Sequence, residues 1–416
     1  MNSDLYDIFL DHPVISTDSR RIEPDSLFFA LHGASFDGNA FALAALEQGA
    51  AVAVIDDKAL YEANKSLGER LFLVEDTLLA LQDLAREHRN ALALPIIAIV
   101  GSNGKTTTKE LVSRVLAERF EVSATVGNLN NHIGVPLTLL KMTGDTEFGV
   151  VEMGASACGE IALLASIAQP NYGIITNIGR SHLEGFGGVE GIRRGKGELY
   201  DFLDSVGGHA FVREEDEVLC QMASERDAMA KEFYSTSLAD GMKSNLVGDY
   251  NRYNIAAAVA IGRYFGVDEE RMAAAIAEYV PSNNRSQVVV TERNRLIVDC
   301  YNANPSSMAA AIENFLKEPL GECSQRVALL GDMLELGEWS GEEHRAIVES
   351  LADNESVEVW LVGEHFTNAA SGVDEMRLFP MREDLEHYLA ENQLSGALVL
   401  LKGSRGIGLE KVIPLL

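Results

Sequence analysis

The chain has 416 residues, and its content of 47% hydrophobic and 23% charged residues is ordinary for folded protein and argues against long disorder. At about 150 residues per domain, this length predicts two to four domains, and the order of the elements favours three. The net charge of −29 argues against a nucleic-acid binder, so an anionic phosphate ligand would need local cations.

Neither a membrane span nor a secretory signal is predicted. The best apolar run, residues 94–100, contains Pro95 and is far shorter than the roughly 20 residues that a bilayer demands. The N-terminus lacks the cationic start and apolar stretch of a signal peptide. The cysteines form no CxxC pair and are expected to be reduced: Cys158, Cys220, Cys300 and Cys323. We therefore expect a cytoplasmic protein with no membrane partner.

The first unit is predicted to cover residues 1–92. Its short apolar runs predict strands, and its amphipathic segments predict helices. The expected strands are 26–31, 51–55 and 71–74, and the expected helices are 41–48 and 77–90. Pro95 follows the last helix closely, which is typical of a break between domains.

The second unit is predicted to cover residues 93–281. Apolar strands alternate with helical segments, which indicates a parallel sheet covered by helices on both faces. The expected strands are 96–100, 149–152 and 172–176, and the expected helices are 106–119 and 254–264. The sequence from Pro281 to Asn284 is typical of a loop and is expected to mark the next boundary.

The third unit, residues 282–416, repeats the alternation and is predicted to be a smaller Rossmann-like domain. Its expected strands are 295–300, 327–330, 358–362 and 397–401, with helices at 308–316 and 342–351. The chain as a whole is therefore predicted to be an α/β protein of three domains, with a doubly wound, mostly parallel sheet in the central one.

A glycine-rich turn follows the strand 96–100 and is the strongest local signal. Its residues are Gly101, Ser102, Asn103, Gly104, Lys105, Thr106 and Thr107. Amides at a helix start, together with the helix dipole, hold phosphate oxygens, while Lys105 can reach the terminal phosphates and Thr106 can ligate Mg²⁺. The alternative is a simple strand-to-helix turn with a surface lysine. A phosphate loop alone does not identify a reaction.

Two candidate metal ligands follow neighbouring strands. Glu152 ends the strand 149–152, and His182 lies after the strand 172–176. Doubly wound sheets place their active sites at the carboxyl ends of strands, so both side chains can face the phosphates. A lone histidine is more often structural, but its position after a strand parallel to that of Glu152 favours a ligand.

Lys196 is a less obvious candidate because it is flanked by Gly195 and Gly197. By itself it indicates a solvated surface lysine in a turn. However, lysine pKa values shift readily on burial, and a neutral lysine amine can react with CO₂ to form an anionic carbamate. The sequence permits this carbamate without requiring it.

In this order, the motifs resemble those of the bacterial Mur ligase family over nearly the whole chain. Besides the phosphate loop, the matching strings are 128–136, 196–200, 248–258, 299–305, 330–337 and 402–406. The resemblance implies three catalytic residues, Lys105, His182 and a carbamylated Lys196. It also implies a set of Mg²⁺ ligands: Thr106, Glu152, His182 and Lys196.

The resemblance further implies ATP as the nucleotide and two groups of binding residues. The ATP contacts are the phosphate loop, Gly101 to Thr107, with Asn251, Asn254, Arg285, Asp299 and Tyr301. The substrate contacts are Asn130, Asn131, Asn302 and Asn304, and a segment in the first unit that resembles a uridine-nucleotide site: Ser16, Thr17, Asp18, Ser19 and Arg20. Without the resemblance, that segment would be an ordinary polar turn.

The resemblance implies amide formation between UDP-N-acetylmuramoyl-tripeptide and D-alanyl-D-alanine through an acyl phosphate. This reaction belongs to peptidoglycan precursor synthesis, and the chain is expected to act as a monomer. One alternative is another member of the superfamily, such as a folylpolyglutamate synthetase or the ligase that adds the third peptide residue. A different class is a nucleotide-gated switch or motor, which would leave Glu152 and His182 unexplained.

Overall fold

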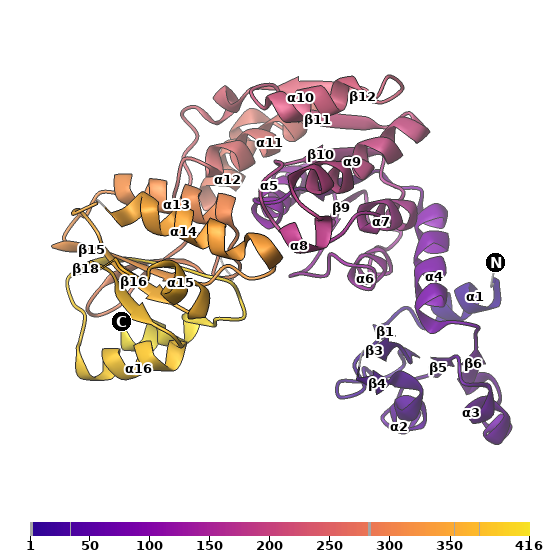
Figure 1. The fold of residues 1–416 in the computed structure, drawn as a ribbon. Coiled ribbons are helices and arrows are strands. Elements are labelled where there is room, and N and C mark those ends of the chain that lie inside the picture. Colours follow the sequence, from indigo (N-terminus) through magenta and orange to yellow (C-terminus); the bar gives the residue numbers. More distant parts are fainter. Residues whose placement is uncertain (1–2, 34, 282–283, 353, 374) are drawn as a thin grey trace.

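The computed structural model describes residues 3–33, 35–281, 284–352, 354–373 and 375–416. It contains three α/β units, and Figure 1 shows the central one between the indigo N-terminal unit and the orange-to-yellow C-terminal unit. The predicted three-domain α/β fold is confirmed. The predicted boundary between residues 281 and 282 adjoins residues 282–283, which lie outside the described residues.

The N-terminal unit is built on a four-stranded parallel sheet with the order β1-β2-β5-β6. Its strands are β1 (Ile15–Ser16), β2 (Leu27–Phe29), β5 (Val52–Ile55) and β6 (Leu71–Leu73), with a separate pair, β3 (His32–Gly33) and β4 (Phe36–Asp37). Its helices are α1 (Ser3–Asp11), α2 (Ala42–Glu47), α3 (Lys58–Ala63) and α4 (Thr77–Leu92). The predicted elements are present, whereas the helices α1 and α3 and the short strands β1, β3 and β4 were not predicted.

The central unit holds a six-stranded parallel sheet with the order β12-β11-β10-β7-β9-β8. The strands are β7 (Ile96–Val100), β8 (Val122–Ala124), β9 (Phe148–Glu152), β10 (Tyr172–Ile175), β11 (His209–Arg213) and β12 (Ala230–Tyr234). The helices are α5 (Lys105–Ala117), α6 (Gly134–Leu139), α7 (Glu160–Ala168), α8 (Leu183–Phe186), α9 (Val189–Val206), α10 (Glu217–Ser224), α11 (Asn251–Tyr264) and α12 (Glu269–Glu278). Every residue of β7 and β9 is buried, as expected for a sheet covered on both faces.

The C-terminal unit has a second six-stranded sheet with the order β13-β14-β18-β15-β16-β17, in which only β13 is antiparallel. The strands are β13 (Gln287–Val290), β14 (Arg295–Asp299), β15 (Gln325–Gly331), β16 (Glu358–Val362), β17 (Arg377–Phe379) and β18 (Ala397–Lys402). The helices are α13 (Pro305–Lys317), α14 (Ser340–Ala352), α15 (Glu364–Ala369) and α16 (Arg382–Glu391). This arrangement confirms the predicted Rossmann-like alternation.

The central unit joins its neighbours at two places. On one side, α4 of the N-terminal unit packs beside α6 and α7. On the other side, two loops of the central unit meet the C-terminal unit. Asn304, just before α13, donates to Asn103 in the loop between β7 and α5 at 2.7 Å, and Arg180, in the loop between β10 and α8, pairs with Glu343 of α14 at 2.6 Å. In the described part of the chain, none of the helices combines the length and apolar character that crossing a bilayer requires.

Candidate active site

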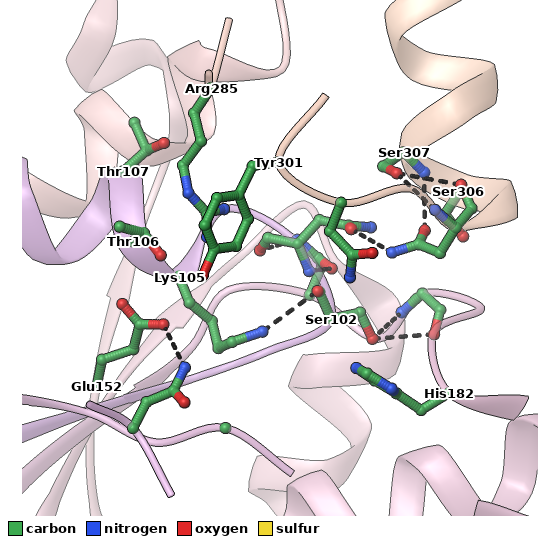
Figure 2. Close-up of a pocket in the computed structure, with 18 of the residues that line it drawn as sticks. Ser102, Lys105, Thr106, Thr107, Glu152, His182, Arg285, Tyr301, Ser306 and Ser307 are labelled. Atoms are coloured by element: carbon green, nitrogen blue, oxygen red, sulfur yellow. Dashed lines mark hydrogen bonds between the residues drawn. The ribbon is translucent and has the colours of Figure 1, made fainter. Parts of the chain in front are cut away.

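A cavity of about 720 Å³ lies between the central and C-terminal units, at the carboxyl ends of β7, β9, β10 and β14. Figure 2 shows side chains from both units around it. It is lined by most of the residues predicted from the sequence: Ser102, Asn103, Gly104, Lys105, Thr106, Thr107, Asn130, Asn131, Glu152, His182, Asn251, Asn254, Arg285, Asp299, Tyr301, Asn302 and Asn304. Gly101, Lys196 and the segment from Ser16 to Arg20 are not among its lining residues.

The phosphate loop is fixed by bonds to the end of β10. The Ser102 amide donates to the Asn177 carbonyl at 3.1 Å, and the Thr176 hydroxyl donates to the Asn103 carbonyl at 2.6 Å. Gly101 has a φ of +150°, and a Cβ there would lie 1.9 Å from Thr176 Oγ1. The turn therefore depends on glycine at this position for both backbone conformation and space.

Lys105 begins α5, and its ammonium group folds back onto the loop. Nζ donates to the Gly101 carbonyl at 2.7 Å and to the Ser102 carbonyl at 3.4 Å (Figure 2). Burial lowers the pKa of Lys105; Glu152 opposes the shift, and Arg285 adds to it. The loop thus holds a cation beside the amides of a helix start, a combination suited to phosphate oxygens.

Asn251 and Asn254 support the loop from α11. The Asn254 side-chain oxygen accepts from the Thr108 hydroxyl at 3.1 Å, and its amide donates to Asn251 at 2.8 Å. A Cβ on Gly104, whose φ is +79°, would lie 2.5 Å from Asn254 Oδ1. Both asparagines line the cavity, and their hydrogen bonds tie α11 to the start of α5.

Glu152 has one carboxylate oxygen without a partner. Its side chain is buried, and Oε1 accepts from Asn130 at 2.8 Å (Figure 2), whereas Oε2 is buried with no hydrogen bond. An unpaired buried carboxylate oxygen is costly unless a cation or donor reaches it. With the Thr106 hydroxyl lining the same cavity, this oxygen fits Mg²⁺, which prefers oxygen ligands.

Protein side chains alone do not complete such a metal site. Within the described ranges, no three His, Cys, Asp or Glu side chains cluster closely enough to hold a metal ion. Mg²⁺ in nucleotide sites commonly takes one or two protein ligands, with phosphates and water supplying the others. The arrangement therefore fits a cation that binds together with a nucleotide.

Lys196 lies inside α9 and is only 1% exposed, so the interpretation as a solvated lysine in a turn is wrong. Its neighbour Gly195 is required by packing, because a Cβ there would lie 2.5 Å from the Phe186 ring. Nζ donates to the Ala155 carbonyl at 3.3 Å and lies 4.9 Å from the centre of the Phe186 ring. Burial, with a smaller contribution from Lys105, lowers the pKa of Lys196 to about 7.

His182 contacts the C-terminal unit. Its Nδ1 lies 2.5 Å from a carboxylate oxygen of Glu335, and this close approach of the imidazole lowers the pKa of Glu335. Glu335 was not predicted as a site residue. Its string, 330–337, was noted as a motif, but its contact with His182 depends on how two domains meet.

The C-terminal side of the cavity carries several charges. The Arg285 guanidinium lies 3.8 Å from the centre of the Tyr301 ring (Figure 2). Asp299 accepts from the buried Lys402 ammonium at 2.7 Å and from the Ser286 amide at 3.1 Å. Lys402 lines the cavity and was not predicted as a site residue, although its string was noted.

The predicted uridine-nucleotide segment lies in the N-terminal unit. Arg20 is 86% exposed and pairs with Asp18 at 2.7 Å, and this partnership lowers the pKa of Asp18 to about 2. The Ser16 hydroxyl bonds to the Ser26 hydroxyl at 3.0 Å. The structure therefore places this segment on a different unit from the cavity.

The fold and the cavity define a class: a three-domain α/β protein with a phosphate-binding loop in its central sheet and a cleft shared with a Rossmann-like domain. Three sequence profiles match, described as "Mur ligase family, catalytic domain" at 13–89, "Mur ligase middle domain" at 99–243 and "Mur ligase, glutamate ligase domain" at 284–405.

Among characterised relatives, the UDP-N-acetylmuramoyl-tripeptide--D-alanyl-D-alanine ligase of Bacillus subtilis is 35% identical over 424 residues, covering 96% of this chain and 92% of that protein. The crystal structure of MurF from Acinetobacter baumannii has a TM-score of 0.84 at 29% identity, covering 96% of this chain and 92% of that chain. MurF ligase from Thermotoga maritima in complex with ADP has a TM-score of 0.82 at 28% identity, with 98% and 97% coverage. The chain belongs to the Mur ligase family, which confirms the resemblance seen in its motifs.

Proposed function

We propose that this chain joins D-alanyl-D-alanine to UDP-N-acetylmuramoyl-tripeptide, with ATP converted to ADP and phosphate, in peptidoglycan precursor synthesis. The observation that carries the proposal is a half-buried lysine, Lys105, and an unpaired carboxylate oxygen of Glu152, which line one cavity between two domains. The names of the similar ligases from Bacillus subtilis and Acinetobacter baumannii support it.

In this proposal, the phosphate loop and Arg285 of the C-terminal unit both act in phosphoryl transfer. A carboxylate is a poor acyl donor, and phosphate from ATP makes an acyl phosphate that the dipeptide amine can attack. Phosphoryl transfer depends mainly on positioning and charge neutralisation. Lys105 and the α5 amides hold phosphate oxygens in this proposal, and Arg285 faces them from across the cavity.

Mg²⁺ belongs to the proposal as well. When bound, it supplies charge neutralisation at the phosphate and acyl oxygens. The residues that would hold it are Thr106, Glu152, His182 and Lys196. For Lys196 the ligand is its carbamate, and a pKa near 7 supports that role because the neutral amine is the form that reacts with CO₂.

The substrate contacts are assigned to both sides of the cavity. Asn130 and Asn131 from the central unit and Asn302 and Asn304 from the C-terminal unit are proposed to contact the peptide ends. Asn251, Asn254, Asp299 and Tyr301 are proposed to contact ATP. The segment from Ser16 to Arg20 is proposed to hold the uridine nucleotide, with Arg20 available for the diphosphate because it is exposed.

We also propose domains at 1–92, 93–281 and 282–416, and a cytoplasmic monomer that contributes to cell shape and division through wall synthesis. ATP and nucleotide-linked substrates are cytoplasmic, and the four cysteines are unpaired.

The test is to incubate the chain with ATP, Mg²⁺, UDP-N-acetylmuramoyl-tripeptide and D-alanyl-D-alanine, and to detect the pentapeptide product by mass. Tripeptides ending in lysine and in meso-diaminopimelate are both offered. ADP and phosphate should appear only when both substrates are present. Product from UDP-N-acetylmuramoyl-dipeptide with a free third amino acid, or from a folate with glutamate, would overturn the proposal, as would ATPase activity without an amide product.

A further inference from the structure

The cavity extends to a tyrosine and an arginine that the proposed function does not use. Tyr253 lies on α11, Arg213 is the last residue of β11, and both line the cavity. Neither was predicted as a site residue, although Tyr253 falls within the noted string 248–258. The proposed function gives the phosphates of ATP a loop and a lysine, but it names no surface for the flat face of the base.

Tyr253 is an aromatic side chain that stays open on a helix that is otherwise well packed. It is 46% exposed, whereas Asn254 and Ile255, the next two residues of α11, are buried. An exposed ring in the wall of a cavity offers apolar surface that a flat ligand can cover. The position of Tyr253 therefore fits a contact with a bound planar group.

Arg213 holds the tyrosine ring from one side. Its guanidinium carbon lies 4.2 Å from the centre of the Tyr253 ring, in a cation–π contact. Arg213 is itself buried and pairs with Asp216 at 2.6 Å, and Asp216 caps α10 by accepting from the Leu219 amide at 3.1 Å. One face of the Tyr253 ring is thus covered by an anchored guanidinium, so the exposed surface belongs to its other face and its edge.

The charges at the two ends of the cavity differ. The Arg213 guanidinium is neutralised by Asp216, whereas the Lys105 ammonium donates to uncharged carbonyl groups of the phosphate loop. Phosphates should therefore bind at the loop, and the end at Tyr253 should take a neutral, flat group. A nucleotide base is such a group, because every base has a π-face that stacks on aromatic side chains.

The sheet register places these two ends at a suitable separation. Ile99 of β7 is level with Ile174 of β10, which is level with Phe211 of β11. Two residues further along, Gly101 of the phosphate loop and Arg213 therefore stand level with each other, two strands apart. Neighbouring strands lie about 4.8 Å apart, which puts these positions about 10 Å from each other. A nucleotide can span this distance, because its ribose lies between the phosphates and the base.

We propose that Tyr253 is the surface on which the adenine base of ATP stacks, and that Arg213 is a positioning residue that holds the Tyr253 ring in place. This inference rests on the proposed function, because it assumes nucleotide phosphates on the phosphate loop. Stacking supplies affinity that does not depend on the phosphates, so the contributions of the base and the phosphates should separate in binding experiments.

The experiment measures, by calorimetry on the full chain, the binding of ATP and of inorganic tripolyphosphate, which has no base. We expect Tyr253→Ala to weaken ATP binding by about tenfold, as for the loss of one base–aromatic stack, and to leave tripolyphosphate binding unchanged. Tyr253→Phe keeps the ring and should bind ATP like the wild type. Arg213→Ala should weaken ATP binding by a smaller factor, and Arg213→Lys should recover part of it, because a cation again lies over the ring.

A surface tyrosine held by an arginine is the competing explanation, and the chain offers a matched control. Tyr264 lies on the same helix and is 43% exposed, but it does not line the cavity. In Tyr253→Trp, ATP should change the fluorescence of the new indole and tripolyphosphate should not. In Tyr264→Trp, neither ligand should change it. Subtracting the wild-type spectrum removes the signal of Trp339 and Trp360.

Thermal unfolding checks that each variant is folded. Wild-type affinity for ATP in Tyr253→Ala, or an equal loss for ATP and tripolyphosphate, would overturn the inference, and an unchanged ATP affinity in Arg213→Ala would overturn the positioning role. A wild-type chain that binds neither ligand would instead overturn the proposed function, so the two failures are distinguishable.

Discussion

The central domain contacts its two neighbours in different ways. Toward the N-terminal domain, α4 side chains donate to backbone carbonyls: Gln82 to His132, His88 to Met142 and Arg89 to Ala168. Toward the C-terminal domain, side chains of one domain contact side chains of the other: Asn304 donates to Asn103, Arg180 pairs with Glu343, and His182 Nδ1 lies 2.5 Å from a carboxylate oxygen of Glu335.

We infer from this difference that the α4 junction mainly stabilises the packing of two domains, whereas the C-terminal junction takes part in ligand binding. The α4 junction buries its polar side chains, and of the acceptors named above one, His132, also lines the cavity, so a ligand should influence this junction less than the other. The C-terminal junction uses Asn103, His182 and Asn304, which all line the cavity. Nucleotide binding and docking of the C-terminal domain should therefore affect each other, because they depend on the same side chains.

The largest effect is expected on the cavity side, at Lys105. Lys105→Ala removes the ammonium group that folds back onto the phosphate loop. We expect pentapeptide formation to fall by about 10³-fold or more, as when a preorganised transition-state donor is deleted. The measurement is ADP release coupled to product mass. Lys141→Ala, at an exposed position, is the control and should be fully active. Near-normal turnover of Lys105→Ala would remove the phosphate loop from the reaction.

The second largest loss of activity is expected for Lys196→Ala. Removing the carbamate takes an anion from the proposed metal site, and we expect activity to fall by about 100-fold, the upper range for loss of a group supporting a metal. Acetate should restore part of the activity, because the alanine leaves space in which a short carboxylate can stand for the carbamate. A fully active Lys196→Ala enzyme would eliminate this role.

The carbamate also predicts a pH dependence. A pKa of about 7 at Lys196 means that the amine is mostly protonated at pH 6 and mostly neutral at pH 8. Since only the neutral amine adds CO₂, the carbamate signal from ¹³CO₂ should be stronger at pH 8 than at pH 6 in ¹³C spectra. Lys196→Ala identifies the signal by its absence. A signal that grows as the pH falls would contradict the assignment.

At the junction with the N-terminal domain, we expect a substitution to change the free energy of unfolding and not kcat. Arg89 is buried and donates to Ala168, Gln169 and Asn171. Arg89→Ala leaves these acceptors without a donor, and we expect a loss of about 2 kcal/mol in the free energy of unfolding.

Denaturant titration measures that loss, and kcat should stay close to the wild-type value. Arg86→Ala is the control on the same helix, because Arg86 makes a single bond to the central domain, to Ser166, and is more exposed. A kcat that falls in Arg89→Ala as far as in Lys105→Ala would break the distinction between the two junctions.

The sequence predicted the elements well because their signals are local. The strand 96–100 is a continuous apolar run between Pro95 and Gly101, and the structure places β7 at the same residues. Lys196 was harder, because Gly195 and Gly197 favour a turn in isolation, whereas packing of Phe186 against Gly195 explains a glycine inside α9. Glu335 could not be found, since its partner lies about 150 residues away on another domain and no local pattern encodes that distance.

The smallest effect is expected at Arg20, on the N-terminal domain. Arg20→Ala removes an exposed guanidinium that pairs only with Asp18 in the described structure, so unfolding should be unchanged. If this segment holds the uridine diphosphate, KM for UDP-N-acetylmuramoyl-tripeptide should rise about tenfold, the loss expected for one charge-assisted hydrogen bond, while KM for ATP and kcat stay constant. Arg70→Ala in the same domain is the control, because its guanidinium bonds to the Leu46 and Ala50 carbonyls and not to this segment. Equal KM values for Arg20→Ala and the wild type would move the nucleotide away from this segment. A rise confined to UDP-N-acetylmuramoyl-tripeptide would place recognition of this substrate on the N-terminal domain, whose described residues take no part in lining the cavity.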